Sequence, residues 1–155
     1  MKNNASISLK TVHPHDRGEM NHVMLTKLEE HWECVDSSIT PDLNNISQGH
    51  AQAIFIIGEQ EERIVGTGVL VPKSTDTAEI IQMSVSSDMC WSSVGTVILH
   101  RLCEESIQHG FSHIMLETRT IWNDMIAFFE HFGFHLTREE GLASGYNRCF
   151  VLDLT

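Results

Sequence analysis

The segment between Ala78 and Phe134 constrains the fold more than any other part of this chain. It runs through a strand-like stretch (AEIIQMSV), a short polar loop (SSDMCWSS), a helical run (VGTVILHRLCEESIQHG), a second strand (HIMLETR) and a second helical run (WNDMIAFFEHFG). A strand that passes through a short loop into a helix start presents unpaired backbone N–H groups, which is a common way to hold a phosphate. The segment therefore predicts an α/β unit with an anion-binding helix start.

The flanking sequence extends this unit into a larger sheet. Predicted strands cover residues 7–12, 53–57, 63–71 and 148–154, and a first helix covers 15–32. Residues 58–62 read as a hairpin loop, and residues 36–49 give only a weak signal for a second helix. Gly66 and Gly68, inside a predicted strand, mark a bulge or a close backbone approach. We expect one domain over 1–155, of class α/β (α+β), with a mixed central sheet of about seven strands and helices on both faces.

Charge and composition narrow the function classes. The formal net charge is -11, and the ten Lys and Arg residues form no cluster, which argues against nucleic-acid binding. The acidic balance favours either cationic partners or solubility alone. No apolar run approaches ~18 residues, and the N-terminus has no apolar secretory core. Four scattered cysteines without a CxxC pair are typical of free thiols, so we expect a cytoplasmic protein. The sequence does not decide between a monomer and a homodimer.

Three motifs carry a resemblance to a known family. The stretch IVGTGVL at 64–70, the loop over 90–95 and AFFEHFGF at 127–134 resemble the GNAT N-acetyltransferase superfamily. The similarity covers residues 52–135 and implies the GNAT fold with acetyl-CoA as cosubstrate. The family loop Q/R-x-x-G-x-G/A falls on CWSSVG, so Cys90 replaces Gln or Arg, Ser93 replaces the first glycine, and only Gly95 is kept.

The resemblance implies a set of cofactor-binding residues. Backbone N–H groups at the helix start would hold the pyrophosphate, and backbone groups of residues 83–85 would pair with the pantetheine arm where the fourth and fifth strands splay apart. The implied residues are Met83, Ser84, Val85, Cys90, Trp91, Ser92, Ser93, Val94, Gly95, Thr96, Asn123 and Phe129. The alternative is that Ser92 and Ser93 are ordinary N-cap residues of a packed helix.

Glu79 is the candidate general base. The run Ala78-Glu79-Ile80 resembles the histone acetyltransferase branch, in which a glutamate at this strand position removes the amine proton. Strand alternation places Glu79 on one face with Ile81 and Met83, and apolar neighbours would raise the pKa of its carboxyl. The alternatives are a solvent-exposed strand glutamate, the lesser candidate Glu117, and a water path without a fixed base.

The family's usual catalytic acid is missing. Its tyrosine slot in the last helix is Phe129, and the slot of a common asparagine is Trp122, with Asn123 one residue on. Tyr146, predicted to lie in the loop before the last strand, is the candidate replacement acid. Alternatively the thiolate leaves unprotonated, because thiols have a pKa of ~8.5.

These features predict an acetyl-CoA-dependent N-acetyltransferase that moves an acetyl group to a primary amine of a small molecule or peptide. The alternatives are a non-catalytic acetyl-CoA-binding sensor and an interaction protein that keeps only the scaffold. The absent glycine fingerprint argues against a dinucleotide site, and no HExxH or Cys/His spacing predicts a metal. Acidic residues near the end of the first predicted helix favour a cationic acceptor. They are Glu29, Glu30, Glu33 and Asp36.

Overall fold

The computed structural model describes residues 7–12, 28, 30–31, 53–118, 123–142 and 145–154. In chain order its elements are β1 (Ser8–Val12), β2 (Ile54–Gln60), β3 (Arg63–Pro72), β4 (Thr77–Val85), α3 (Trp91–Gln108), β5 (His113–Thr118), α4 (Asn123–Phe132), β6 (His135–Leu142) and β7 (Gly145–Asp153). Leu28, Glu30 and His31 are helical, in agreement with the predicted first helix. The remainder of that prediction, and the weak one over 36–49, lie outside the described residues.

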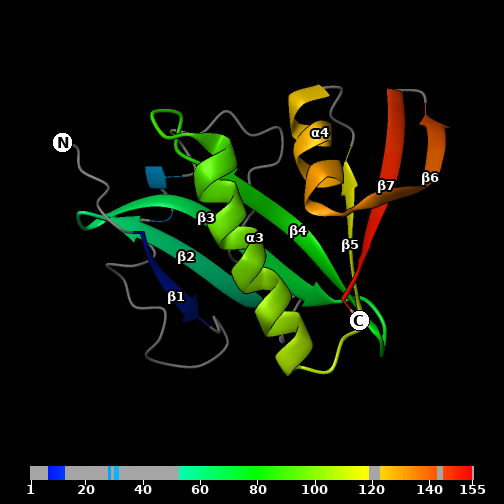
Figure 1. Ribbon diagram of the computed structural model, residues 1–155, viewed down its shortest axis with the longest axis horizontal. Coiled ribbons are helices and arrows are strands. Elements are labelled where there is room, and N and C mark those ends of the chain that lie inside the picture. Colours follow the sequence, from blue (N-terminus) through cyan, green and yellow to red (C-terminus); the bar gives the residue numbers. More distant parts are fainter. Residues whose placement is uncertain are drawn as a thin grey trace.

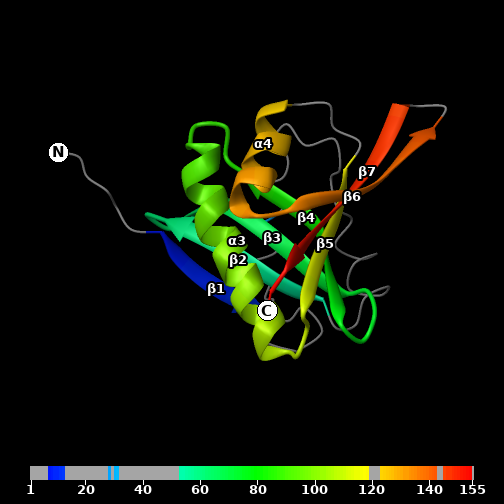
Figure 2. The ribbon, with the colours of Figure 1, turned by 45° about the vertical axis from the view of Figure 1, so that its right-hand side comes forward.

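The seven strands form one mixed sheet in the order β1-β2-β3-β4-β5-β7-β6. Every neighbouring pair is antiparallel except β4 and β5, which run parallel and are joined by α3. Helices α3 and α4 lie on one face of the sheet (Figures 1 and 2). We call this the α3 face and the opposite one the His31 face. The expected mixed sheet of about seven strands is confirmed. No described helix is long and apolar enough to cross a membrane.

Each face of the sheet buries its own apolar cluster. On the α3 face, Ile98, Leu99 and Leu102 of α3 are fully buried against strand residues such as Ile56 and Ile114. On the His31 face, the fully buried Leu28 packs with a second set of strand residues: Phe55, Ile57, Val69 and Val71. Burial on both faces explains why β2 and β3 read as continuous apolar runs rather than alternating ones.

Gly66 and Gly68 allow α3 to approach β3 closely. A Cβ added at Gly66 would lie 2.5 Å from Ile98 Cδ1 and 2.7 Å from Val94 Cγ1, and one at Gly68 would lie 2.9 Å from Ile98 Cγ2. A register shift between β2 and β3 also begins beside Gly58, the partner of Gly66. The close approach and the bulge predicted from the two glycines are therefore both present.

Two predicted boundaries are wrong. The β2–β3 connection is not a loop over 58–62 but a two-residue turn, in which Glu61 and Glu62 have φ values of 54° and 66°. Consecutive left-handed residues twist with the strands and close a tight hairpin, so the strands extend to Gln60 and Arg63. Tyr146 does not lie in a loop: it is in β7, which starts at Gly145, and its backbone pairs with Gly141 of β6.

A buried polar chain ties the helical residue His31 to the sheet. His31 Nε2 lies 2.8 Å from Ser84 Oγ, and its Nδ1 lies 3.3 Å from Ser86 Oγ. Ser84 Oγ lies 2.6 Å from Thr67 Oγ1, which donates to Gln82 Oε1 at 2.9 Å. Burial lowers the pKa of His31 to about 4, so the imidazole is neutral at pH 7.

Gly66→Ala should destabilise the protein by about 1–3 kcal/mol, because the new methyl would displace Ile98 and Val94 in a packed core. Gly58→Ala is the matched control, since a Cβ there meets two side-chain ends at 3.3 and 3.5 Å and the Gly66 carbonyl oxygen at 3.6 Å, which is ordinary contact or close to it. Urea unfolding followed by circular dichroism measures both variants. Equal costs at the two positions would contradict a close helix approach at Gly66.

The buried His31 should make stability depend on pH. Its pKa is about 4 when folded and near 6.5 when unfolded, so only the unfolded chain gains this proton between those values. The contribution is complete above pH 6.5 and is lost as pH falls towards 4, by on the order of 2 kcal/mol. His31→Gln should remove this part of the slope, whereas the exposed His135→Gln should keep it. Identical slopes in wild type and His31→Gln, measured by urea unfolding, would contradict a buried neutral imidazole.

Candidate functional site

The pairing of β4 with β5 covers only the first four residues of each strand. The parallel register runs from Thr77 with His113 to Ile80 with Leu116, and no later pair joins the described residues of these strands. Beyond that point β4 stays with β3, and β5 stays with β7 through Glu117 and Thr118. The two strands diverge towards the start of α3 (Figure 1). A gap with an unpaired strand edge therefore opens inside the sheet.

Backbone groups of β4 face this gap. The Ser86 N–H donates to Val65 O at 2.8 Å, which directs it towards β3. Because backbone groups alternate along a strand, the N–H groups of Met83 and Val85 point away from β3 and towards the gap. Unpaired N–H groups on a strand edge bind extended ligands that carry amides. The β4–β5 pairing ends before residues 83–85, and the binding of a pantetheine arm by their backbone groups stays a prediction.

The start of α3 lies at the same end of β4 as the gap. Cys90 is the N-cap and makes no side-chain capping hydrogen bond with a described residue, so Ser92 and Ser93 belong to the first turn and are not caps. The first turn, residues 91–94, contains no acidic residue. Its N–H groups and the helix dipole therefore favour an anion. Thr96 turns its hydroxyl back to Ser92 O at 2.5 Å and points no donor outward.

Hydrogen-bond donors at the start of α3 lower the pKa of the Cys90 thiol. Cys90 is exposed, and its pKa is lowered to about 7, first by the Ser92 hydroxyl and then by Ser93. The Ser92 Oγ lies 3.3 Å from Cys90 Sγ. By contrast, burial raises the pKa of Cys103, further along the same helix, to about 11. The loop thus stabilises a negative charge although it lacks the family's Arg or Gln.

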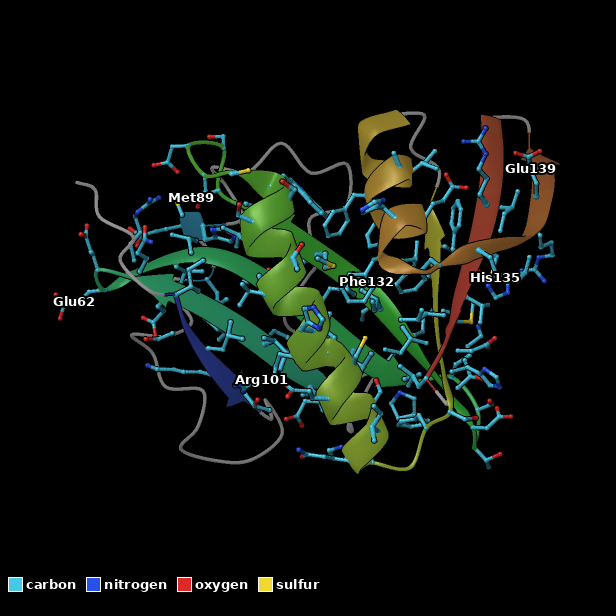
Figure 3. All side chains as sticks on the ribbon, viewed as in Figure 1. Glu62, Met89, Arg101, Phe132, His135 and Glu139 are labelled. Atoms are coloured by element: carbon cyan, nitrogen blue, oxygen red, sulfur yellow. The ribbon has the colours of Figure 1, made fainter. Side chains whose placement is uncertain are left out.

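Aromatic rings fill the space between α3 and α4. The Trp91 ring lies 4.8 Å from Phe128 and 6.1 Å from Phe129, centroid to centroid. A Cβ at Gly95 would lie 2.7 Å from the Trp91 ring, so this glycine accommodates the indole. Phe132, labelled in Figure 3, lies with its ring 5.0 Å from that of His100 of α3. Phe129 is buried in this cluster and carries no hydroxyl where the family has its acid.

The prediction that Met83 shares the face of Glu79 is wrong, because β4 contains a bulge, whereas Ile81 packs on that face as predicted. Leu70 pairs with Ile80 and Val69 pairs with Gln82, so Ile81 is an extra residue. Alternation reverses beyond it: Met83 opposes Gly68 on the α3 face, whereas Gln82 joins the face of Glu79. The Glu79 side chain is 19% exposed and lies 4.0 Å from Lys73 Nζ. It is neither fully exposed nor enclosed by Met83.

Glu117 lies on the same face, across the opening. Ile114 and Leu116 pack on the α3 face, so Glu117, the residue after Leu116 in an alternating strand, points to the His31 face. Its carboxylate lies 3.6 Å from Arg138 of β6. The strands that separate therefore carry one carboxylate each on this face. The backbones of Asn123 and Tyr146 lie in α4 and β7, but their side chains are outside the described set.

Sequence reasoning missed the polar chain from His31 to Gln82. Its signal was the placement of Thr67, Gln82 and Ser84 within otherwise apolar strands, where an unpaired polar group is costly. His31 was not singled out, because pairing between residues 53 positions apart is invisible without the fold. No group of three or more possible metal ligands occurs among the described residues.

The sequence matches a protein-family model, and the fold is similar to solved structures whose names place them among acetyltransferases. Residues 21–134 match the model of the acetyltransferase (GNAT) family. Among solved structures, the ribosomal-protein-S18-alanine N-acetyltransferase from Escherichia coli superposes with a TM-score of 0.77 at 13% identity, covering 97% of this chain and 95% of that one. The aminoglycoside 6'-N-acetyltransferase from Enterococcus faecium gives 0.76 at 15% identity, covering 97% of each chain.

A third similar structure was solved with acetyl-CoA bound. A GNAT family acetyltransferase from Elizabethkingia anophelis with acetyl-CoA bound gives a TM-score of 0.69 at 14% identity, covering 95% of this chain and 97% of that one. No curated protein matches in sequence. Because the family model spans well over half of the residues, the chain belongs to the GNAT acetyltransferase family.

Proposed function

We propose that this protein transfers the acetyl group of acetyl-CoA to a primary amine by direct attack of the amine on the thioester. The observation that carries the proposal is the end of β4–β5 pairing at Ile80, beside the start of α3. This arrangement combines an amide-binding strand edge with an anion-binding helix start. Pantetheine contains two amides and coenzyme A a pyrophosphate, so one ligand satisfies both features.

Donor binding would rest on the backbone. The N–H groups of Met83 and Val85 face the gap and would pair with the pantetheine arm, while those of the first turn of α3 would meet the pyrophosphate. The Ser92 and Ser93 hydroxyls, which are the main groups that lower the pKa of Cys90, would add side-chain donors for phosphate oxygens. Since backbone donors do not depend on side-chain identity, Cys90 and Ser93 can occupy the motif without loss of these contacts.

The carboxylate of Glu79 is the best-placed general base. It lies on the His31 face of β4, one residue before the last pair with β5. The neutral amine would attack the thioester carbon, so that a C–N bond forms and the C–S bond breaks. Glu79 takes the amine proton, and the electron pair leaves with the coenzyme A sulfur. A thiolate with a pKa of ~8.5 departs without an acid, which agrees with a phenylalanine at position 129. Tyr146 remains the predicted alternative acid.

A cationic amine fits the charge of the site. The chain has a formal net charge of -11. Glu79 and Glu117 lie on the strands that border the opening, where each has one cationic neighbour, Lys73 at 4.0 Å and Arg138 at 3.6 Å. An acidic surface attracts cations over long distances, and this attraction weakens with salt. The E. coli and E. faecium proteins act, by their names, on an alanine of ribosomal protein S18 and on an aminoglycoside, and both names specify N-acetylation.

A non-catalytic acetyl-CoA sensor is the second candidate. Phe129 is buried among Trp91, Phe128 and Phe134 rather than offering a hydroxyl to the gap. A sensor needs the donor site but no acid and no base. Turnover distinguishes the two candidates, because both require binding of acetyl-CoA.

The test is an amine-panel assay with acetyl-CoA that follows thiol release, combined with Glu79→Gln. Wild type should acetylate at least one amine, and Glu79→Gln should lower kcat by ~10²–10⁴ because proton removal is lost. Acetyl-CoA affinity, measured by calorimetry, should stay nearly unchanged, since the backbone edge is intact.

Glu117→Gln is the matched control, because it removes a carboxylate from the same face but from the other strand. It should keep kcat within about tenfold. Acetyl-CoA binding without turnover of any amine would favour the sensor. If Glu79→Gln kept wild-type kcat, the base would be water. An absence of acetyl-CoA binding would contradict both candidates.

A further inference from the structure

The amide of Gln82 carries an unused donor inside the protein. Gln82 is 5% exposed, and its Nε2 is buried with no hydrogen-bond partner in the described part of the chain. The other end of the amide is occupied, because Oε1 accepts from Thr67 Oγ1. Buried polar atoms are almost always paired, and each exception calls for a functional or solvent explanation. An unpaired donor at this position would gain a hydrogen bond from a ligand oxygen or a water that reached it.

The hydrogen-bond chain that ends at Gln82 has one direction. Thr67 gives its only hydroxyl proton to Gln82, so Ser84 must donate to Thr67. Ser84 then has no proton left for His31, so its oxygen accepts from His31 Nε2–H. The Ser86 hydroxyl lies 3.3 Å from His31 Nδ1 and also donates to Ile64 O at 3.4 Å. A chain aligned in this way polarises each successive group and strengthens the last donor, which is the Gln82 N–H.

Gln82 lies in the part of β4 that is no longer paired with β5. The last β4–β5 pair is at Ile80, and the bulge at Ile81 places Gln82 on the same face as Glu79. Their partners on β3 are Val69 and Val71, which lie two residues apart, or about 7 Å along a strand. A strong neutral donor therefore lies one step along the same face from the proposed base.

We propose that Gln82 determines acceptor specificity: its Nε2–H donates a hydrogen bond to a hydroxyl or amide oxygen of an acceptor whose amine is held at Glu79. The assignment rests on the proposed function and adds the chemical class of the substrate, which is an amine bearing an oxygen a few bonds away. Amino alcohols and amino amides belong to this class, and plain alkylamines do not. His31, Ser84 and Thr67 are positioning residues that hold the amide by its oxygen.

The test compares isosteric pairs of amines on the full chain. 3-Amino-1-propanol is paired with butylamine, and β-alaninamide with 3-methylbutylamine, so each pair differs only in its oxygen-bearing group. The kcat/KM ratio within each pair is measured with acetyl-CoA, and binding of each amine is measured by calorimetry with coenzyme A present. Wild type should favour the oxygen-bearing member of at least one pair by about tenfold to a hundredfold.

Two substitutions remove the donor in different ways. Gln82→Met deletes both polar atoms, and Gln82→Glu keeps an acceptor for Thr67 but loses the N–H. Both should reduce the ratio to less than about threefold while acetyl-CoA affinity stays unchanged. Ser84→Ala should reduce the ratio by interrupting the chain, whereas His31→Gln, which retains a donor for Ser84, should preserve it.

The outcomes separate this inference from the proposed function. An active wild type without a preference in either pair would overturn the inference alone. So would variants that keep the preference while losing stability, as expected if a trapped water satisfies Nε2. A binding preference without turnover would support Gln82 as a contact and overturn the transferase activity. An absence of amine binding would overturn both.

Discussion

The shortness of the parallel pairing between β4 and β5 is the feature on which the rest of the site depends. The pairing lasts from Thr77 to Ile80 on β4, because β4 then bulges at Ile81 while β5 remains paired with β7. One local irregularity thus opens the sheet, exposes a backbone edge and changes which side chains face each way. Glu79 and Gln82 share a face only because of that bulge. A regular β4 would place Gln82 on the α3 face, where apolar side chains are buried.

The surrounding packing holds the irregular region in place. Gly66 and Gly68 bring α3 close to β3, so the start of α3 has a fixed position beside the end of β4. On the other face, His31 is bound to Ser84 through a buried hydrogen bond. A rigid frame of this kind positions binding groups without the cost of ordering them at each encounter. The variable parts are side chains, so Cys90 and Ser93 can occupy the loop before α3 without removing its backbone N–H groups.

The sequence predicted the fold better than the chemistry of the site. Element order, the mixed sheet and the close approach at Gly66 follow from local patterns and agree with the structure. The sequence did not predict which side chains of β4 share a face. The bulge depends on the pairing of β4 with β3, and an apolar strand carries no local pattern that indicates it. The unpaired Gln82 amide and its link to His31 were unpredictable for the same reason: both arise from contacts between distant segments. Tyr146 was placed in a loop because β7 begins with polar residues.

The account rests on an open β4 edge, and amide hydrogen exchange measures it residue by residue. The N–H groups of Met83 and Val85 should exchange quickly in the free protein and slow by at least about tenfold with saturating acetyl-CoA, since the bound arm would pair with them. The amides of Gln82 and Ser84, which alternate towards β3, should be protected in both states. Protection of Met83 and Val85 already present without ligand, or unchanged when acetyl-CoA is bound, would contradict the account.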